Sequence, residues 1–386
     1  LETMARIDVD YDLLTRESEI LRLHFFDSAF EQLKSSGAVR LEADGKNAGC
    51  WVMPLSESEE FKGLEDPDKV IVRSDGTGTY VGKDIAYQLW KFGLLGRDFD
   101  YRHFLDTGVW ETNYPGVDDH PAFGDAERVV NVIDARQSYL QRIVRAGLEA
   151  LGHTEQAEQS VHFAYEMVSL SEQTARQLGF LDGDDSAGRK SLEMSGRKGI
   201  GVKADDLIDR LEERSREEIA ERNRDLEPGE LDELARQIAV AALRYFMTKA
   251  TTTRVIAFDL DEALSFEGDS GPYLQYSLVR ARNIRRKLDE SGMESQVDPA
   301  EVAALPAELW SDDLWDLVLA SAQTPDVVAR GADTLELSLL ARQAVELAQR
   351  FHSVYHHHPI RQEPDDALRS VRLATTQVFV RTLLAL

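Results

Sequence analysis

The chain carries, at residues 193–200, the stretch Glu193-Met194-Ser195-Gly196-Arg197-Lys198-Gly199-Ile200. Glycines flank an Arg and a Lys in this stretch, a Ser precedes them, and Asp205 marks the start of a helix shortly afterwards. A loop of this kind can bring cations and backbone N–H groups to a polyphosphate and move away after a reaction. An exposed basic loop without a ligand explains the same spacing equally well. The residues alone leave both interpretations open.

The sequence ahead of this loop alternates between extended and helical patterns. Val70–Val72 and Val129–Ile133 have the apolar, β-branched composition of strands, whereas Ile85–Phe92 and Ser138–Leu151 have helical spacing. Strands that alternate with helices of this length predict βαβ units and a parallel sheet. We therefore expect a partial, Rossmann-like parallel sheet within residues 69–228.

The regions on either side of this α/β part have different patterns. Residues 1–68 combine a helix expected over Glu17–Ser35 with short extended runs, which predicts an inserted α+β subdomain. Leu226-Glu227-Pro228-Gly229 interrupts a charged helical stretch, and helical apolar spacing then continues to the last residue. We expect residues 229–386 to form an all-α helical bundle.

Composition limits the classes of protein to consider. The chain has 386 residues, 42% hydrophobic and 30% charged, which is enough for two or three domains with their own cores. Cys50 is the single cysteine, so we expect no disulfide and no structural metal, in a reducing cytoplasm. A net charge of −26 argues against non-specific binding of polyanions, so any RNA binding needs local patches. Apolar runs are shorter than the roughly 18 residues of a membrane span.

Met194–Gly199 resembles, residue by residue, the second signature of class I aminoacyl-tRNA synthetases, in the Met-Ser-x-Arg-Lys-Gly form of arginyl-tRNA synthetases. The resemblance implies that ATP is bound by Met194, Ser195, Gly196, Arg197 and Lys198. It also implies that Ser195, Arg197 and Lys198 contribute to catalysis, with Mg²⁺ accompanying the ATP. Glu193 stands where many relatives have Lys, which removes one phosphate contact.

A second group of residues resembles the arginine pocket of this family. Tyr80 and Asp84 are four residues apart and share a face if a helix begins near Tyr80. Taken alone, the pair would be an ordinary feature of a helix surface. The resemblance gives both residues, together with Glu17 and Gln137, the role of binding the substrate arginine. Two carboxylates would then accept charge-assisted bonds from the flat guanidinium.

The helical region contains a basic and aromatic segment. Tyr273, Tyr276 and Arg280 follow the i, i+3, i+7 spacing of one helical stripe, and five cations between positions 280 and 287 have no acid among them. A core stripe with a solvated basic face is an equally good interpretation of the pattern. The segment resembles the Gly-x-x-Gly-x-Tyr-x-Gln-Tyr hallmark of the arginyl-tRNA synthetase anticodon-binding domain. The resemblance implies tRNA binding by Tyr273, Gln275, Tyr276, Arg280, Arg282 and Arg285.

The resemblance implies a domain order and a function. Residues 1–68 would be the inserted subdomain of the catalytic domain, residues 69–228 its C-terminal part, and residues 229–386 the anticodon-binding domain. The implied activity is arginine–tRNA ligation, in which ATP activates L-arginine for transfer to arginine tRNA, with no membrane or DNA partner. The His-x-Gly-His segment that relatives need for ATP is absent, so we expect a fragment that is inactive alone.

Two alternatives remain at this point. A non-catalytic, tRNA-binding or regulatory relative that lost its front half would have the same motifs. An aspartyl-phosphate phosphatase is the other, because Val255–Asp261 imitates the strand that carries its nucleophile. The second alternative needs a five-stranded sheet around Asp259, and a helix start with solvated acids explains the residues better.

Overall fold

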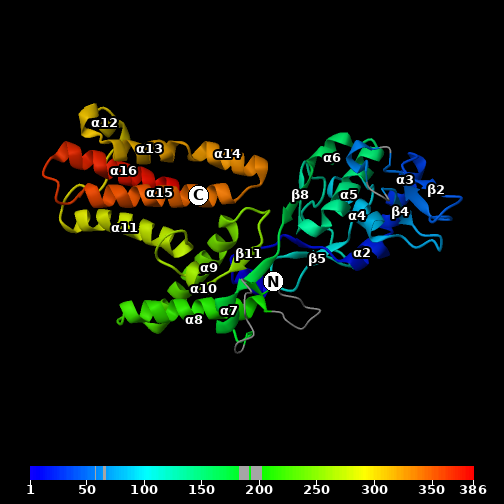
Figure 1. The fold of residues 1–386 in the computed structure, drawn as a ribbon, viewed down its shortest axis with the longest axis horizontal. Helices are drawn as coiled ribbons and strands as arrows, with labels where there is room; N and C mark the ends of the chain where they lie inside the picture. Colours follow the sequence, from blue (N-terminus) through cyan, green and yellow to red (C-terminus); the bar gives the residue numbers. More distant parts are fainter. Residues whose placement is uncertain (57, 64–66, 182–190, 193–201) are drawn as a thin grey trace. The chain divides into compact units, whose positions relative to one another are not determined.

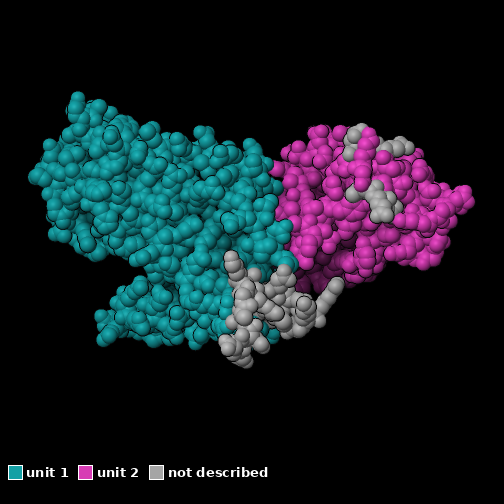
Figure 2. Space-filling view, in the orientation of Figure 1, with its two compact units in different colours: residues 1–9, 166–386 teal, residues 10–165 magenta. Residues whose placement is uncertain are grey.

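The computed structural model describes residues 1–386 with the exception of residues 57, 64–66, 182–190 and 193–201. The chain forms two compact units, shown in Figure 2: unit 1 contains residues 1–9 and 166–386, and unit 2 contains residues 10–165. The backbone therefore passes between the units twice. The domain limits at residues 68 and 228 stay a prediction.

Unit 2 is a mixture of short strands and helices (Figure 1). In chain order, its elements are β1 (Leu13–Leu14), α2 (Glu17–Arg22), α3 (Phe25–Ser35), β2 (Arg40–Leu41), β3 (Trp51–Met53), η1 (Glu59–Phe61), β4 (Lys69–Val72), α4 (Tyr80–Lys91), β5 (Tyr101–His103), β6 (Trp110–Thr112), β7 (Val129–Asp134), η2 (Ala135–Gln137), α5 (Ser138–Ala150), α6 (Thr154–Gln159) and β8 (Ser160–Tyr165).

The strands of unit 2 form three small sheets with the orders β1-β6-β5, β2-β3-β4 and β7-β8. Strands β7 and β8 are parallel, from the pair Val129–Ser160 to the pair Asp134–Tyr165, and α5 and α6 connect them. This is the βαβ unit that the alternating pattern predicted. The prediction of an α/β region is confirmed, although its sheets are small and mixed.

Helix α4 has a buried face that fixes its orientation. The Thr79 side chain accepts a hydrogen bond from the Gly82 backbone N–H and caps the helix. Val81, Ile85 and Leu89 are buried on one side. A Cβ at Gly82 would lie 2.4 Å from the Phe26 ring of α3, so only glycine permits this close contact. The opposite side of α4, with Tyr80 and Asp84, is left facing solvent.

Unit 1 is mainly helical. In chain order, its elements are α1 (Glu2–Ala5), β9 (Val168–Ser171), α7 (Glu172–Gln177), β10 (Ser191–Leu192), α8 (Ala204–Arg222), α9 (Pro228–Lys249), β11 (Ile256–Phe258), α10 (Leu260–Ala263), α11 (Gly271–Glu290), α12 (Pro299–Ala303), η4 (Ala307–Leu309), α13 (Asp312–Ala322), α14 (Thr324–Thr334), α15 (Ser338–His357) and α16 (Asp366–Ala385).

Helices α11 to α16 form the helical bundle that the sequence predicted. Helices α11, α15 and α16 contact one another and lie side by side in Figure 1. The core is apolar, and the rings of Phe351 and Phe379 stack in it with their centroids 4.3 Å apart. Ser270 is the N-cap of helix α11, and its side chain accepts from the Tyr273 N–H at 3.2 Å. A Cβ at Gly271 would lie 2.3 Å from the Ala241 carbonyl oxygen, so α11 starts in tight contact with α9.

One strand lies in the region that the sequence predicted to be helical. Strand β11 runs parallel to β9, and the described sheet has the order β10-β9-β11. Asp259 follows β11 as the N-cap of α10, where it accepts from the Glu262 N–H at 3.0 Å and from Ser171 Oγ at 2.6 Å. One carboxylate oxygen caps α10 and the other accepts from Ser171. The described sheet has three strands, whereas the phosphatase alternative needs five. Both observations remove the support for a phosphatase nucleophile.

Candidate functional site

Unit 2 brings three of the four residues of the predicted arginine pocket to one surface. Tyr80 and Asp84 lie one turn apart on α4, and Tyr80 is 74% exposed. Glu17 is the first residue of α2. Lys83 connects the two helices, since its Nζ lies 3.5 Å from Glu17 Oε1 and 5.4 Å from the centre of the Tyr80 ring. A cation thus already lies between a carboxylate and an aromatic ring.

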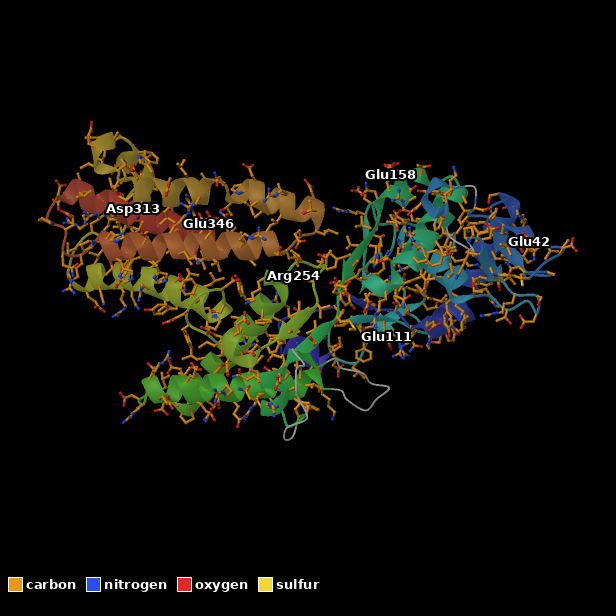
Figure 3. All side chains as sticks on the ribbon, in the orientation of Figure 1. Glu42, Glu111, Glu158, Arg254, Asp313 and Glu346 are labelled. Carbon is orange, nitrogen blue, oxygen red and sulfur yellow. The ribbon has the colours of Figure 1, made fainter. Side chains whose placement is uncertain are left out.

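A buried ion pair fixes the chain just before Glu17. Glu111 of β6, labelled in Figure 3, is 3% exposed and accepts from Arg16 Nε and Arg102 Nε, both at 2.8 Å. Burial opposes ionisation of Glu111, but the hydrogen bonds from Arg16 and Arg102 hold its pKa below the usual value. The Arg16 N–H also donates to Thr112 Oγ1 at 2.8 Å. The start of α2, and with it Glu17, is therefore tied to the β1-β6-β5 sheet.

Asp84 lies in a mixed electrostatic environment. Its residue is exposed on α4, yet desolvation of the carboxylate by neighbouring protein atoms raises its pKa. Lys91 opposes this rise, the negative charge of Glu17 adds to it, and Lys83 opposes it again. A bound guanidinium would favour the charged forms of both carboxylates.

The structure adds two residues that the sequence analysis did not identify. Tyr80, Asp84, Tyr87 and Lys91 form one stripe along α4 at positions i, i+4, i+7 and i+11. The Tyr87 hydroxyl donates to Thr15 Oγ1 at 2.9 Å, and Lys91 Nζ lies 4.5 Å from the Tyr87 ring centre. Extending the i, i+4 pair along the helix would have found both residues.

Lys91 connects this stripe to strand β7. Its Nζ donates to Asn131 Oδ1 at 2.8 Å. Burial lowers the pKa of Lys91 to about 8, and the nearby carboxylate of Asp84 acts in the opposite direction. An ammonium group with this pKa is protonated in most molecules at neutral pH, so Lys91 adds a positive charge near Asp84.

Gln137, the fourth predicted residue, lies beyond the end of β7. Asp134 caps the short helix η2 by accepting from the Arg136 N–H at 2.8 Å, and Gln137 follows in that turn with an exposed side chain. Hydrogen bonds from Arg136 lower the pKa of Asp134 to about 2. Among the described contacts, none joins Gln137 to Glu17, Tyr80 or Asp84.

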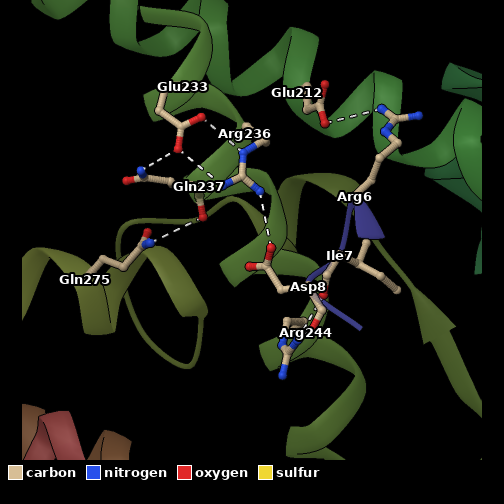
Figure 4. A network of polar contacts seen from close by, with 9 residues as sticks. All are labelled: Arg6, Ile7, Asp8, Glu212, Glu233, Arg236, Gln237, Arg244 and Gln275. Atoms are coloured by element: carbon tan, nitrogen blue, oxygen red, sulfur yellow. Dashed lines mark hydrogen bonds and ion pairs between the residues drawn. The ribbon is translucent and has the colours of Figure 1, made fainter. Parts of the chain in front are cut away.

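The predicted phosphate loop lies outside the described residues, and this holds for Met194, Ser195, Gly196, Arg197 and Lys198. The helix after it, α8, is described from its first turn. Asp205 accepts from Thr3 Oγ1 at 2.8 Å and from Arg6 Nη1 at 3.0 Å. Arg6 also pairs with Asp209 at 2.6 Å and with Glu212 at 3.2 Å, the latter seen in Figure 4.

The first nine residues are held on a second helix as well. Arg236 of α9 lies 3.4 Å from Asp8 Oδ1, and Arg244 Nη1 donates to the Ile7 and Asp8 carbonyls at 2.9 Å and 2.7 Å (Figure 4). Three arginines thus attach this short segment to α8 and α9. This arrangement could not be predicted from local sequence, because the partners are about two hundred positions apart.

Helix α11 presents the predicted aromatic stripe to α15. The ring of His352 lies 5.2 Å from that of Tyr273 and 5.9 Å from that of Tyr276. The Arg280 guanidinium lies 4.6 Å from the Tyr276 ring centre and 4.7 Å from the Tyr355 ring centre. His352 and Tyr355 come from a helix about 75 residues away in sequence, and the sequence analysis missed them.

A chain of hydrogen bonds determines the tautomer of His352. Arg280 Nη1, which can only donate, lies 2.8 Å from His352 Nδ1, so that Nδ1 is the acceptor. The proton is then on Nε2, which donates to Ser277 Oγ at 2.9 Å, and Ser277 in turn donates to the Tyr273 carbonyl at 2.7 Å. Burial first, and then the Arg280 charge, lowers the pKa of His352 to about 4. His352 is neutral at physiological pH.

The other predicted tRNA-binding residues lie on different sides of α11. The Gln275 side chain donates to the Gln237 carbonyl of α9 at 3.3 Å (Figure 4). Arg286, a neighbouring cation outside the predicted set, pairs with Glu290 at 2.5 Å. Arg282 and Arg285 line a groove next to α16. The five cations between positions 280 and 287 therefore do not form one patch.

Two family models match the chain. Residues 122–260 match the model described as "tRNA synthetases class I (R), catalytic domain", and residues 274–385 match the model described as "DALR anticodon binding domain". The second match covers helices α11 to α16, the bundle that carries the aromatic stripe and the groove lined by Arg282 and Arg285.

Similar proteins extend over almost the whole chain. The arginine–tRNA ligase of Deinococcus radiodurans is 36% identical over 97% of this chain, and this region is 59% of that protein. The ligase of Pyrococcus furiosus is 32% identical over 99% of this chain, corresponding to 58% of its own length. The chain thus spans less than two thirds of the length of these relatives.

Solved structures have the same fold. The arginyl-tRNA synthetase of Thermus thermophilus superposes with a TM-score of 0.82 at 32% identity, over 99% of this chain and 59% of that one. A structure from Campylobacter jejuni, at 16% identity, has a TM-score of 0.59 and supports the fold alone. Within the described residues, every helix is too short or too polar to cross a bilayer.

Proposed function

The chain belongs to the arginyl-tRNA synthetase family, and on that premise we propose that it forms part of an arginine–tRNA ligase. In this reaction, ATP and L-arginine give arginyl-adenylate and pyrophosphate, and the arginyl group then passes to the terminal adenosine of arginine tRNA. A cytoplasmic location, with neither membrane nor DNA as a partner, belongs to the same proposal. The relatives are longer than this chain, so the reaction is proposed for the protein as a whole.

The arrangement of Glu17, Tyr80 and Asp84 supports arginine as the amino-acid substrate. The observation that carries this proposal is the position of Lys83, whose ammonium already lies between Glu17 and the Tyr80 ring. A guanidinium placed there could pair with Glu17 and Asp84 and lie against the ring of Tyr80, because it is flat and donates in a fork. Gln137, next to strand β7, is proposed to contact the rest of the amino acid.

The loop of residues 194–198 is proposed to bind ATP, with Ser195, Arg197 and Lys198 acting on the phosphates. Support comes from its sequence and from the family model that covers it. Cations and backbone N–H groups would stabilise the charge that develops on the leaving pyrophosphate. Mg²⁺ enters this proposal together with ATP as part of the substrate.

The helical bundle is proposed to bind tRNA through α11. Tyr273, Tyr276 and Arg280 form a surface with His352 and Tyr355 on which an unpaired base could stack. Because Arg280 is bonded to His352, its side chain is held in place before any ligand arrives. The match of this bundle to the DALR anticodon-binding model supports the anticodon arm as the bound region.

Arginine binding tests the pocket directly. We expect L-arginine to bind to the chain more tightly than L-lysine in isothermal titration calorimetry, and Asp84→Asn to weaken this binding by roughly tenfold, since a paired charge is lost. Glu155→Gln, an exposed carboxylate on α6, is the matched control and should leave binding unchanged. Equal weakening by both variants would contradict the pocket. Binding of tRNA without any binding of arginine would favour a non-catalytic tRNA-binding relative.

A further inference from the structure

A groove of about 500 Å³ lies between α11, α16 and the connection that follows α11. It is on a different side of α11 from the aromatic stripe. Arg282 and Arg285 are two and five residues beyond Arg280, which places them about 200° and 140° around the helix from it. The residues lining the groove are Ala281, Arg282, Arg285, Ser295, Gln296, Leu373, Thr376, Gln377, Val380, Arg381 and Leu384.

The rim of this groove carries an excess of positive charge. Arg282 and Arg285 come from α11, Arg381 comes from α16, all three are exposed, and no lining residue is acidic. Within the part of the chain that the structure describes, no carboxylate pairs with any of them, whereas the neighbouring Arg286 pairs with Glu290 and Arg372 pairs with Glu363. In a protein of net charge −26, three arginines around one groove that have no carboxylate partner among the described residues favour an anionic ligand.

The groove is also preorganised. When the Gln296 amide is oriented so that its oxygen faces Arg285, which satisfies the donors and acceptors on both sides, that oxygen accepts from Arg285 Nε at 3.2 Å and from Nη1 at 2.8 Å. Gln377 of α16 accepts from the Val297 N–H at 2.9 Å and donates to the Val297 carbonyl at 3.1 Å. These bonds hold the connection against α16 and hold Arg285 at the rim. A ligand would therefore meet cations that are already positioned.

The floor of the groove is apolar. Ala281, Leu373 and Thr376 are at most 4% exposed, and Val380 and the 56% exposed Leu384 continue this surface outward. A bare inorganic anion has no apolar surface that could be buried against this floor. A nucleotide fits both parts, because its phosphate can be bound by guanidinium groups while its base covers apolar surface.

We propose that this groove binds a nucleotide of the RNA backbone, so that α11 contacts RNA on two sides. The inference rests on the proposed tRNA-binding function and adds Arg381 to it. Arg282, Arg285 and Arg381 bind the phosphate, and the apolar floor accepts the face of the base. The stripe of Tyr273, Tyr276 and Arg280 binds a different nucleotide of the same RNA.

Binding of arginine tRNA by single-charge variants tests this site. We expect Arg381→Gln and Arg282→Gln each to weaken binding roughly five- to tenfold in fluorescence anisotropy, and to reduce the slope of log K against log salt by about one. Arg286→Gln removes the same charge from the same helix but on the Glu290-paired side, and it should change affinity less than twofold. Unchanged thermal unfolding of all three variants shows that the fold is kept.

The outcomes separate this inference from the function on which it rests. Wild-type binding with equal effects of Arg381→Gln and Arg286→Gln overturns the groove and leaves tRNA binding by the chain in place. Absence of wild-type binding overturns both. A loss of affinity for heparin without a loss for tRNA assigns the groove to other polyanions and also overturns the inference. A hairpin of the anticodon arm alone should reproduce the effect of Arg381→Gln.

Discussion

In the proposed arginine pocket, Lys83 lies beside Glu17 and changes the charge that a substrate would meet. In the absence of arginine, two neighbouring carboxylates would repel each other, and the ammonium of Lys83 beside Glu17 reduces that repulsion. Glu17 is 66% exposed in its side chain, so the pair is screened by water and contributes at most about 1 kcal/mol. If the proposed pocket binds arginine, the substrate would displace this weakly held internal cation.

Removal of Lys83 should therefore favour the substrate. We predict that Lys83→Met lowers the Kd for L-arginine roughly two- to fivefold in calorimetry, because the competing ammonium is gone. Lys34→Met, which removes a lysine paired with Glu31 at 2.9 Å on α3, should leave the Kd unchanged. Weaker binding by Lys83→Met would mean that Lys83 holds the substrate instead of competing with it.

His352 should make the protein sensitive to acid. Its pKa is about 4 in the folded state and about 6.5 when unfolded. Between pH 4 and pH 6.5, His352 is therefore protonated in the unfolded chain but not in the folded chain. Stability is therefore complete above pH 6.5 and falls as the pH decreases toward 4. We predict that the free energy of unfolding in urea decreases between pH 7.5 and pH 5 in the wild type, and that this decrease is smaller in His352→Gln by about 1–2 kcal/mol. An identical loss in both proteins would contradict this assignment.

Among single residues, those whose partners lie on the same helix could be predicted from the sequence. Tyr80 and Asp84 were identified through the resemblance, which their local spacing fits, and Tyr87 and Lys91 could have been found by following the same stripe. His352 and Tyr355 could not, because nothing in their local sequence shows that α15 packs against α11. The roles of the four pocket residues came from the resemblance and remain predictions.

Among the elements, α11 depends on its first turn. Ser270 caps it, and Gly271 lets it approach the backbone of α9 so closely that a side chain has no room. The position of this turn sets the rotation of the whole helix, and through it the two surfaces that face α15 and α16. A short contact at one end therefore controls residues several turns away.

Exchange of one glycine should show this dependence. We predict that Gly271→Ala destabilises the protein by about 1–3 kcal/mol in urea unfolding, because its Cβ would lie 2.3 Å from a backbone oxygen that cannot rotate away. Gly229→Ala, in the first turn of α9, meets nothing within 4 Å and should be neutral or stabilising by up to about 1 kcal/mol. Equal stability of the two variants would contradict the close packing of α11.

The elements themselves were largely predictable. The βαβ unit of β7, α5, α6 and β8 and the bundle from α11 to α16 follow from periodicity in the sequence. Strand β11 was not expected as a strand within its helical surroundings. It has three residues, and what makes it a strand is its pairing with β9, nearly ninety positions earlier. Pairing at that distance leaves no local signal.

At the scale of the whole molecule, the chain has the fold of a larger family while spanning 59% of a relative such as the Deinococcus radiodurans ligase. Its sequence contains no His-x-Gly-His segment. The resemblance to arginyl-tRNA synthetases implies that adenylate formation needs both ATP signatures, because the phosphates would be held at a helix N-terminus while the loop stabilises the leaving group. The division into two units was not predictable, since it depends on Arg6, Arg236 and Arg244 binding partners far away in sequence.

Arginine activation is therefore expected to fail in a solution of this chain alone. We predict no arginine-dependent exchange of labelled pyrophosphate into ATP above a protein-free blank. A complete relative, such as the Thermus thermophilus enzyme, serves as the positive control in the same assay. Exchange that rises in proportion to the concentration of this chain would contradict the prediction.

The attachment of residues 1–9 to α8 and α9 matters for transplanting parts of this protein. Residues 10–165 interrupt unit 1 as a cassette, with one junction at Asp10 and the other at Tyr165. A chimaera that exchanges the cassette with that of a relative has to keep the short N-terminal piece with its host, together with the three arginines that hold it. Cutting the gene once, at residue 166, would instead separate Arg6 from Asp205 and leave the new boundary with unmatched charges.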